Sequence, residues 1–134
     1  MNSIDIVIDA HALMVFLQGE PGHEMVSRLF HSAANSNRPL LITSVNYGEI
    51  LYIILRELGK KKQLEMESII EELPITIVDV DKQIAKAAAT FKAKGGMSYA
   101  DCFAAGLAFL RKASVLTGDK EFKTVETEIK IIWI

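Results

Sequence analysis

Four acidic residues stand where apolar runs of the sequence end or where helical patterns begin. Asp9 directly follows one apolar run, Asp119 follows another by way of Thr117-Gly118, and Glu49 and Asp101 lie early in predicted helices. Carboxylates gathered in one cleft repel one another, which raises their pKa values or destabilises the fold unless a cation neutralises them. An oxygen-only ligand set without a His or Cys constellation suits Mg²⁺ or Mn²⁺ rather than zinc. Because such a cation commonly serves phosphoryl chemistry, the sequence predicts phosphodiester hydrolysis at a metal site.

Taken singly, each acid also has an ordinary structural explanation. Asp9 and Asp119 stand where the N-caps of helices are expected. Ser98-x-x-Asp101 has the pattern of a capping box, and Glu49 has the position of a first-turn acid favoured by the helix dipole. The apolar neighbours of Glu49 and Asp101 favour a shared site, because a carboxylate on a helix with little solvated face needs a partner.

Short runs rich in β-branched residues predict the strands of the fold. There are five: Ile4–Ile8, Leu40–Thr43, Ile75–Val80, Val115–Thr117 and Ile129–Trp133. Apolar residues that recur at three- and four-residue spacing predict two helices in each of the first three connections, and a short helix should follow Gly118. This order calls for right-handed crossovers and for a parallel sheet that helices cover on both faces, so we expect a three-layer α/β domain.

The four acids then meet at one edge of the predicted sheet. Ligand sites of such sheets lie beyond the carboxyl ends of the strands, where loops diverge and helix N-termini point inward. Asp9, Glu49 and Asp119 can face that edge directly. Asp101 reaches it from the second helix of a crossover pair, which must run back past the edge. The sequence therefore predicts one cleft with four carboxylates.

Length and composition limit the remaining possibilities. A chain of 134 residues and 14.9 kDa fits one domain over residues 1–134, and an apolar fraction of 50% excludes a disordered chain. A net charge of −2 provides no general positive field, so nucleic acid must be bound locally. The single cysteine, Cys102, fits a reducing compartment. Uncharged stretches of at most ten residues are too short to span a membrane, and residues 1–5 do not resemble a signal peptide, so we expect a cytoplasmic protein.

At four places the sequence resembles PIN-domain ribonucleases, and more narrowly the VapC-type toxins of toxin–antitoxin pairs. The segments that carry the resemblance are Ile6–Leu13, the segment around Glu49, Ser98–Ala104 and Leu116–Phe122. They occur in order along the whole chain, which is more specific than any single acid. The resemblance implies a five-stranded parallel sheet between helices, with endoribonuclease activity.

Residue roles follow from the same resemblance. It makes Asp9, Glu49, Asp101 and Asp119 a catalytic quartet that holds one or two Mg²⁺ or Mn²⁺ ions. Water activated by the metal would then attack an RNA phosphodiester. Thr117 matches the family's hydroxyl residue two positions before the last acid, where it would orient that carboxylate or a water on the metal.

His11 departs from the family pattern, in which Ser or Thr usually supports the first Asp and the metal's water. Its imidazole either replaces that donor or leaves the metal more weakly held, and it could also touch the substrate. Lys120 and Lys123, just beyond the last acid, are candidates for contact with RNA phosphates, or else surface residues at the start of a helix.

The resemblance also implies protein partners. Toxins of this type usually form homodimers and are held inactive by a cognate antitoxin whose tail lies across the active-site groove. The apolar run Leu13–Leu17 next to Asp9 is compatible with such a groove, although core packing explains each of its apolar residues as well. No motif encodes which RNA is cut.

Two other functions fit parts of the pattern. A signalling receiver would use Asp79 or Asp81 as phosphoryl acceptor, but receivers usually have paired acids after the first strand and a Lys near the end of the last. Here Asp9 is followed by Ala10, and the last four residues, Ile-Ile-Trp-Ile, carry no Lys. The other alternative is a PIN-like scaffold that has lost catalysis and only binds RNA or a partner. His11 favours the scaffold, whereas the intact quartet favours activity.

Overall fold

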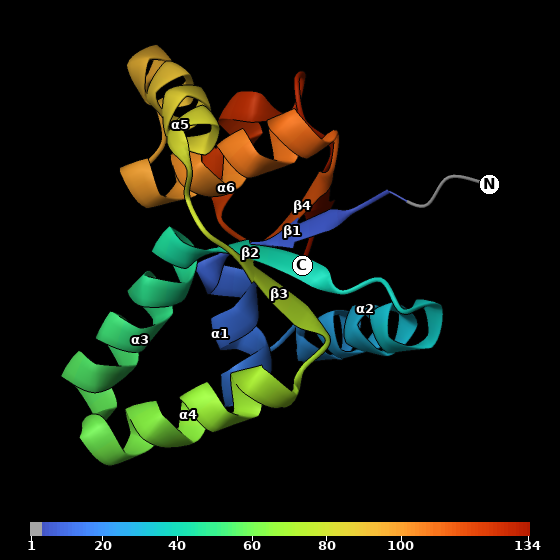
Figure 1. The fold of residues 1–134 in the computed structure, drawn as a ribbon, viewed down its shortest axis with the longest axis vertical. Helices are drawn as coiled ribbons and strands as arrows, with labels where there is room; N and C mark the ends of the chain where they lie inside the picture. The colour runs from blue at the N-terminus through green and yellow to red at the C-terminus, as the bar shows by residue number, and fades with distance from the viewer. Residues whose placement is uncertain (1–3) are drawn as a thin grey trace.

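Five parallel strands form one sheet at the centre of the fold, in the order β3-β2-β1-β4-β5 (Figure 1). The structure is a computed structural model that describes residues 4–134. The register pairs Val7 with Leu41 on one side and with Val115 on the other, so β1 lies between β2 and β4. The strands are β1 Ile6–Ile8, β2 Leu40–Thr43, β3 Ile75–Val78, β4 Ser114–Thr117 and β5 Ile131–Trp133.

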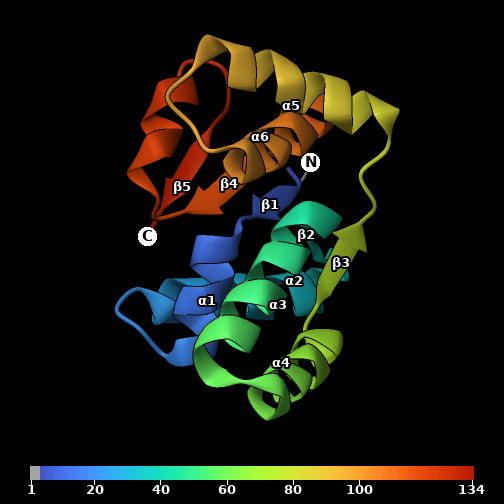
Figure 2. The same ribbon diagram turned by 90° about the vertical axis from the view of Figure 1, so that its left-hand side faces the viewer.

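Helices cover both faces of this sheet. On one face lie α5, α6 and the short 3-10 helix η1, and on the other face lie α1 to α4 (Figure 1 and Figure 2). The helices are α1 Ala10–Gln18, α2 His23–Ser36, α3 Ser44–Leu58, α4 Lys60–Glu72, α5 Lys82–Lys94, α6 Tyr99–Arg111 and η1 Lys120–Val125.

Successive residues of the central strands face opposite cores. Val7 packs in the cluster under α5 and α6, whereas Ile8 packs in the cluster under α1 to α4. In β4, Val115 and Leu116 divide between the two clusters in the same way. Side chains of a strand alternate between its two faces, so a strand that is covered on both faces has to be apolar throughout. This requirement explains why the strand segments are largely apolar.

The predicted three-layer α/β architecture is confirmed, and the differences lie at the ends of elements. The first strand begins at Ile6 rather than Ile4, and the last begins at Ile131 rather than Ile129, because the paired residues start there. The third strand ends at Val78 rather than Val80. These shifts leave the acids of the predicted site at the carboxyl edge of the sheet.

One local expectation is wrong. Helix α3 begins at Ser44 and is capped by Thr43, whose Oγ1 accepts a hydrogen bond from the Asn46 N–H at 3.0 Å. Glu49 therefore lies in the second turn of α3, where the helix dipole no longer explains an acid. Residues 1–3, at the start of the predicted domain span 1–134, lie outside the described residues. Within residues 4–134, no helix has the length and apolar character needed to cross a membrane.

Close packing of α5 on α6 depends on a glycine. A Cβ atom added at Gly106 would lie 3.0 Å from the Ala88 nitrogen and 3.2 Å from the Ala87 Cβ. A Gly106→Val substitution should therefore push the two helices apart and lower the free energy of unfolding by about 1–3 kcal/mol. Urea denaturation followed by circular dichroism measures this change.

Gly48 provides the matched control, because a Cβ added there meets no atom within 4 Å. In the middle of α3, Gly48→Ala should raise the free energy of unfolding by about 0.5–1 kcal/mol. Equal stability of the Gly106→Val variant and the wild type would contradict the close approach of α5 and α6.

Candidate active site

Two loops and two helices bring acidic residues to the carboxyl edge of the sheet. Asp9 follows β1, Asp119 follows β4, and Glu49 lies in α3, which follows β2. Helix α6 leads into β4 at the opposite edge, so its first turn, with Asp101, lies at the carboxyl edge. Strand order reverses between β1 and β4, and this reversal is where ligands bind in open α/β sheets.

Asp9 is almost completely buried, with 1% of its surface exposed, and both of its carboxylate oxygens accept hydrogen bonds. Oδ1 accepts from the Ala12 N–H at 2.8 Å and thereby caps α1. Oδ2 accepts from the Thr117 hydroxyl at 2.5 Å. Burial raises the pKa of Asp9 to about 6, although both hydrogen bonds and nearby His11 lower it. The Asp9 carboxylate is thus fixed in position but lacks full compensation for its charge.

Thr117 joins the first acid to the last. Its Oγ1 donates to Asp9 and accepts from the Asp119 N–H at 2.9 Å. Because Thr117 is fully buried, water does not compete for these two bonds. The hydroxyl therefore holds the start of α1 against the loop after β4, and the carboxylate that it contacts is that of Asp9 rather than that of Asp119.

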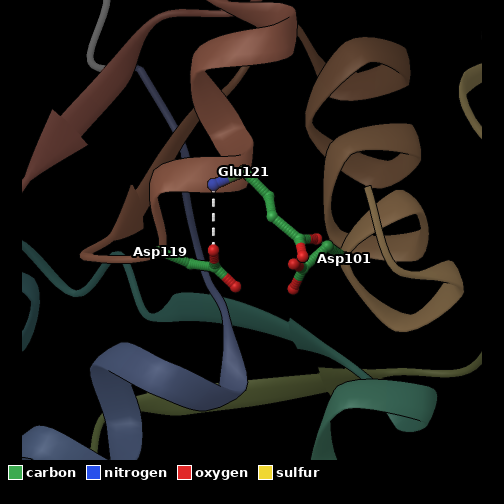
Figure 3. A group of neighbouring side chains, drawn as sticks. All are labelled: Asp101, Asp119 and Glu121. Atoms are coloured by element: carbon green, nitrogen blue, oxygen red, sulfur yellow. Dashed lines mark hydrogen bonds between the residues drawn. The ribbon is translucent and has the colours of Figure 1, made fainter. Parts of the chain in front are cut away.

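Asp101 and Asp119 meet at the carboxyl edge of the sheet, and a further acid lies beside them. One carboxylate oxygen from each of Asp101, Asp119 and Glu121 lies within 4.8 Å of the other two. Figure 3 shows Asp101 on α6 and Glu121 on η1 with adjacent carboxylates, and Asp119 facing them. Burial is the largest cause that raises the pKa of Asp101 to about 9, followed by hydrogen bonding with Asp119 and the charges of Asp119 and Asp9. These carboxylates must share a proton or a cation.

Glu49 lies apart from this three-acid cluster. It is half-buried in α3, and its pKa is raised by burial and by the charge of Asp119, while the Asn46 side chain opposes the shift. The structure therefore brings Asp101 and Asp119 together directly. Asp9 and Glu49 lie around them, within electrostatic reach of Asp119.

Sequence reasoning missed Glu121 and the structural part played by Asn46. Asn46 is fully buried, accepts a hydrogen bond from the Thr43 hydroxyl at 2.5 Å, and donates from Nδ2 to the Ala100 carbonyl at 3.1 Å. It thereby ties the start of α3 to the first turn of α6. The available signal for Asn46 was an amide side chain beside a predicted strand end. For Glu121 the signal was an acid two residues after Asp119.

The remaining predicted residues lie at the surface. His11 is exposed, and its ring lies against Gly118, because a Cβ added at Gly118 would come within 2.6 Å of the His11 Cε1. Lys120 and Lys123 are exposed on η1, and neither forms an ion pair within residues 4–134. Asp81, an acceptor in the receiver alternative, instead caps α5 by accepting from the Ile84 N–H at 2.9 Å. The observed strand order also differs from the 2-1-3-4-5 order of receivers.

Known proteins resemble this chain in both sequence and fold. Ribonuclease VapC30 of Mycobacterium tuberculosis is 27% identical over 125 residues, which cover 88% of this chain and 92% of the relative. The DNA-bound VapBC structure from Salmonella typhimurium has a TM-score of 0.79 at 20% identity, over 97% of this chain and 98% of that chain. The Mycobacterium tuberculosis VapC20, described as a sarcin–ricin loop cleaving toxin, has a TM-score of 0.71 at 14% identity, over 90% of this chain and 95% of that chain.

These structural likenesses concern the fold, because their sequence identities are low. Family membership comes from a sequence model. The model for the PIN domain matches residues 6–128, which include all four acids of the predicted quartet. The chain belongs to the PIN domain family.

Proposed function

We propose that this chain is a divalent-metal-dependent endoribonuclease and the toxin of a toxin–antitoxin pair. The observation that carries the proposal is the close group of Asp101, Asp119 and Glu121 oxygens at the carboxyl edge of a PIN fold. Relatives over most of the chain are named VapC ribonucleases, which supports RNA as the substrate. A protein of similar fold is described as cleaving the sarcin–ricin loop, so a structured RNA is one target to test.

The side chains at this edge fit a hard divalent cation. The group of Asp101, Asp119 and Glu121 offers only oxygen atoms, which Mg²⁺ and Mn²⁺ prefer. The raised pKa values of Asp9 and Asp101 indicate negative charge that no cationic side chain fully compensates. We assign Mg²⁺ or Mn²⁺ to the predicted quartet of Asp9, Glu49, Asp101 and Asp119. A cation bound there supplies Lewis-acid chemistry, because it polarises a phosphate oxygen and lowers the pKa of water.

The chain's own residues hold these ligands in place. Each carboxylate oxygen has two acceptor positions, so Asp9 keeps free lone pairs after its bonds to Ala12 and Thr117. Thr117 fixes the distance between the segments of Asp9 and Asp119. In this proposal Lys120 and Lys123 contact RNA phosphates. They provide local positive charge on a chain whose net charge is −2.

His11 and the partners complete the proposal. The exposed imidazole of His11, packed on Gly118 and within electrostatic reach of Asp9, donates to water or to the substrate. Residues 1–134 act as one nuclease domain in the cytoplasm and form a homodimer. A cognate antitoxin inhibits that domain, which the VapBC complexes of similar fold support.

Cleavage of total cellular RNA by the purified protein tests the activity. The protein is incubated with Mn²⁺ or Mg²⁺, beside EDTA, and the new RNA ends are mapped. We expect discrete cuts that need the metal. Binding of RNA without any cut would instead favour the scaffold alternative, and phosphate uptake from acetyl phosphate would favour a receiver.

Asp101→Asn should reduce the cleavage rate by about 100-fold or more, because the amide loses the negative charge that holds the cation. The matched control is Asp79→Asn, the same change at an exposed acid outside the quartet. It should cut RNA at the wild-type rate. Comparable cutting by the Asp101→Asn protein would remove Asp101 from the proposed site.

In metal-free protein, stability should fall as pH rises. The folded-state pKa values of Asp9, about 6, and Asp101, about 9, lie above the value near 3.9 expected in the unfolded chain. The folded state then binds more protons, so the free energy of unfolding decreases from about pH 4 upward. The decrease continues through pH 6 and towards pH 9.

Thermal melts in EDTA at pH 5, 7 and 8.5 measure this trend. Asp101→Asn should be more stable than wild type by about 1 kcal/mol or more at pH 8.5, because folding of the wild type at this pH requires Asp101 to take up a proton, whereas the amide is neutral without one. Excess Mn²⁺ should stabilise the wild type through preferential binding to the folded state. A melting temperature of wild type that stays constant across this range would contradict the charge crowding.

Thr117→Val should misplace both Asp9 and Asp119, since it removes the hydroxyl but keeps a similar volume. We expect about 10- to 100-fold weaker Mn²⁺ affinity and a similar loss of cleavage. Thr117→Ser retains the hydroxyl and should stay within a few-fold of wild type. Isothermal titration with Mn²⁺ distinguishes the two variants, and equal affinity for both would show that the hydroxyl is dispensable.

A further inference from the structure

Glu121 connects the two segments that carry Asp101 and Asp119. Its N–H donates to Asp119 Oδ1 at 2.9 Å, which caps η1. Its own Oε1 accepts from the Ser98 N–H at 2.7 Å, at the start of α6. Asp101 lies three residues after Ser98. One side chain therefore ties the loop after β4 to the helix that presents Asp101 (Figure 3).

The bond to Ser98 occupies a position that Asp101 would otherwise fill. Ser98 Oγ accepts from the Asp101 N–H at 3.2 Å, which is the first half of a capping box. In the second half, the acid three residues on accepts from the N–H of the capping residue. Here Glu121 accepts that bond instead. The carboxylate of Asp101 is not used for capping and can lie beside Asp119.

The start of α6 favours such an acceptor. The first N–H groups of a helix have no partner within the helix, and its positive end attracts anions. A hydrogen bond from an N–H to a carboxylate is stronger than one between neutral groups. If Glu121 were absent, the nearest carboxylate in sequence would be Asp101, which would turn back to cap its own helix.

We propose that Glu121 is a positioning residue, which takes over the capping of α6 from Asp101 and so keeps the Asp101 carboxylate turned towards Asp119. This inference deepens the proposed function and rests on it for the cation. In this role, the acceptor oxygen of Glu121 and the length of its side chain are what matter. The charge of Glu121 and direct contact with a cation are not required.

Three substitutions at Glu121 separate the effects of side-chain length, acceptor oxygen and charge. Glu121→Gln keeps the length and the acceptor oxygen without the charge, whereas Glu121→Asp keeps the charge but is one methylene too short. Glu121→Ala removes all three. The matched control is Glu128→Ala, an exposed acid of the same segment that pairs with Lys94 at 2.6 Å. Because Glu121 is itself exposed, these variants should fold.

Two readouts use the purified full chain without RNA. Mn²⁺ affinity by isothermal titration should fall about 10- to 100-fold for Glu121→Ala and Glu121→Asp, and remain within about 3-fold for Glu121→Gln and Glu128→Ala. The Ser98 amide proton, followed by NMR in metal-free protein, should keep a downfield shift in Glu121→Ala because Asp101 replaces the lost acceptor. It should lose that shift when Asp101→Ala is added.

The opposite pattern would overturn the inference. If Glu121→Asp bound Mn²⁺ like wild type while Glu121→Gln did not, the charge of Glu121 would matter and its reach would not. Wild-type affinity in Glu121→Ala would exclude any positioning. A downfield Ser98 amide in the Glu121→Ala/Asp101→Ala double variant would exclude the exchange of caps. Neither readout involves RNA. A protein that failed to cut RNA would therefore contradict the proposed function without deciding the role of Glu121.

Discussion

Repulsion between carboxylates is the constraint under which the whole carboxyl edge of the sheet is built. The negative charges of Asp9, Asp101 and Asp119 repel one another at short range. Burial removes the water that would screen this repulsion. Uncharged donors hold the carboxylates of Asp9 and Asp119 in place: backbone N–H groups and the Thr117 hydroxyl. Within residues 4–134, none of the three acids forms an ion pair with Lys or Arg. A cationic side chain would relieve the repulsion, but it would also fill the space between the carboxylates.

Apolar packing in the rest of the fold offsets the destabilisation that the repulsion between carboxylates causes. Two apolar clusters, one on each face of the sheet, bury the central strands on both sides. Hydrogen bonds between distant segments then fix the loops and helix ends that carry the acids. Asn46 joins α3 to α6, and Glu121 joins η1 to α6. The acids are thus held by contacts between helices and strands, which position side chains more precisely than loops do.

The sequence was sufficient for the architecture and for the edge at which the acids meet, because both follow from periodic patterns. Apolar strands and helices of 3.6-residue period are local signals, and parallel strands must end at a common edge. Distances between acids are not local. Glu49 and Asp101 are both followed directly by apolar residues, yet Asp101 lies in the close group and Glu49 lies apart from it. The difference depends on tertiary packing, which a local pattern does not contain.

The part of Glu121 could not be read from the sequence for a similar reason. Ser98-x-x-Asp101 has the pattern of a local capping box, and that pattern is half correct. The other half is supplied from 23 residues further along the chain. A local pattern shows that a donor needs an acceptor, but tertiary structure decides which acceptor it receives.

The bond between Thr117 and Asp9 joins residues 108 positions apart. It forms only when β4 has been added beside β1, after most of the chain has been synthesised. Proteins are made from the N-terminus at roughly 5–20 residues per second, so the segment of Asp9 exists for seconds before its partner emerges. A nascent or truncated chain that ends before β4 contains Asp9, Glu49 and Asp101 but lacks the strand that brings Asp119 to them. The order of strands along the chain therefore delays assembly of the complete acidic group until synthesis is nearly finished.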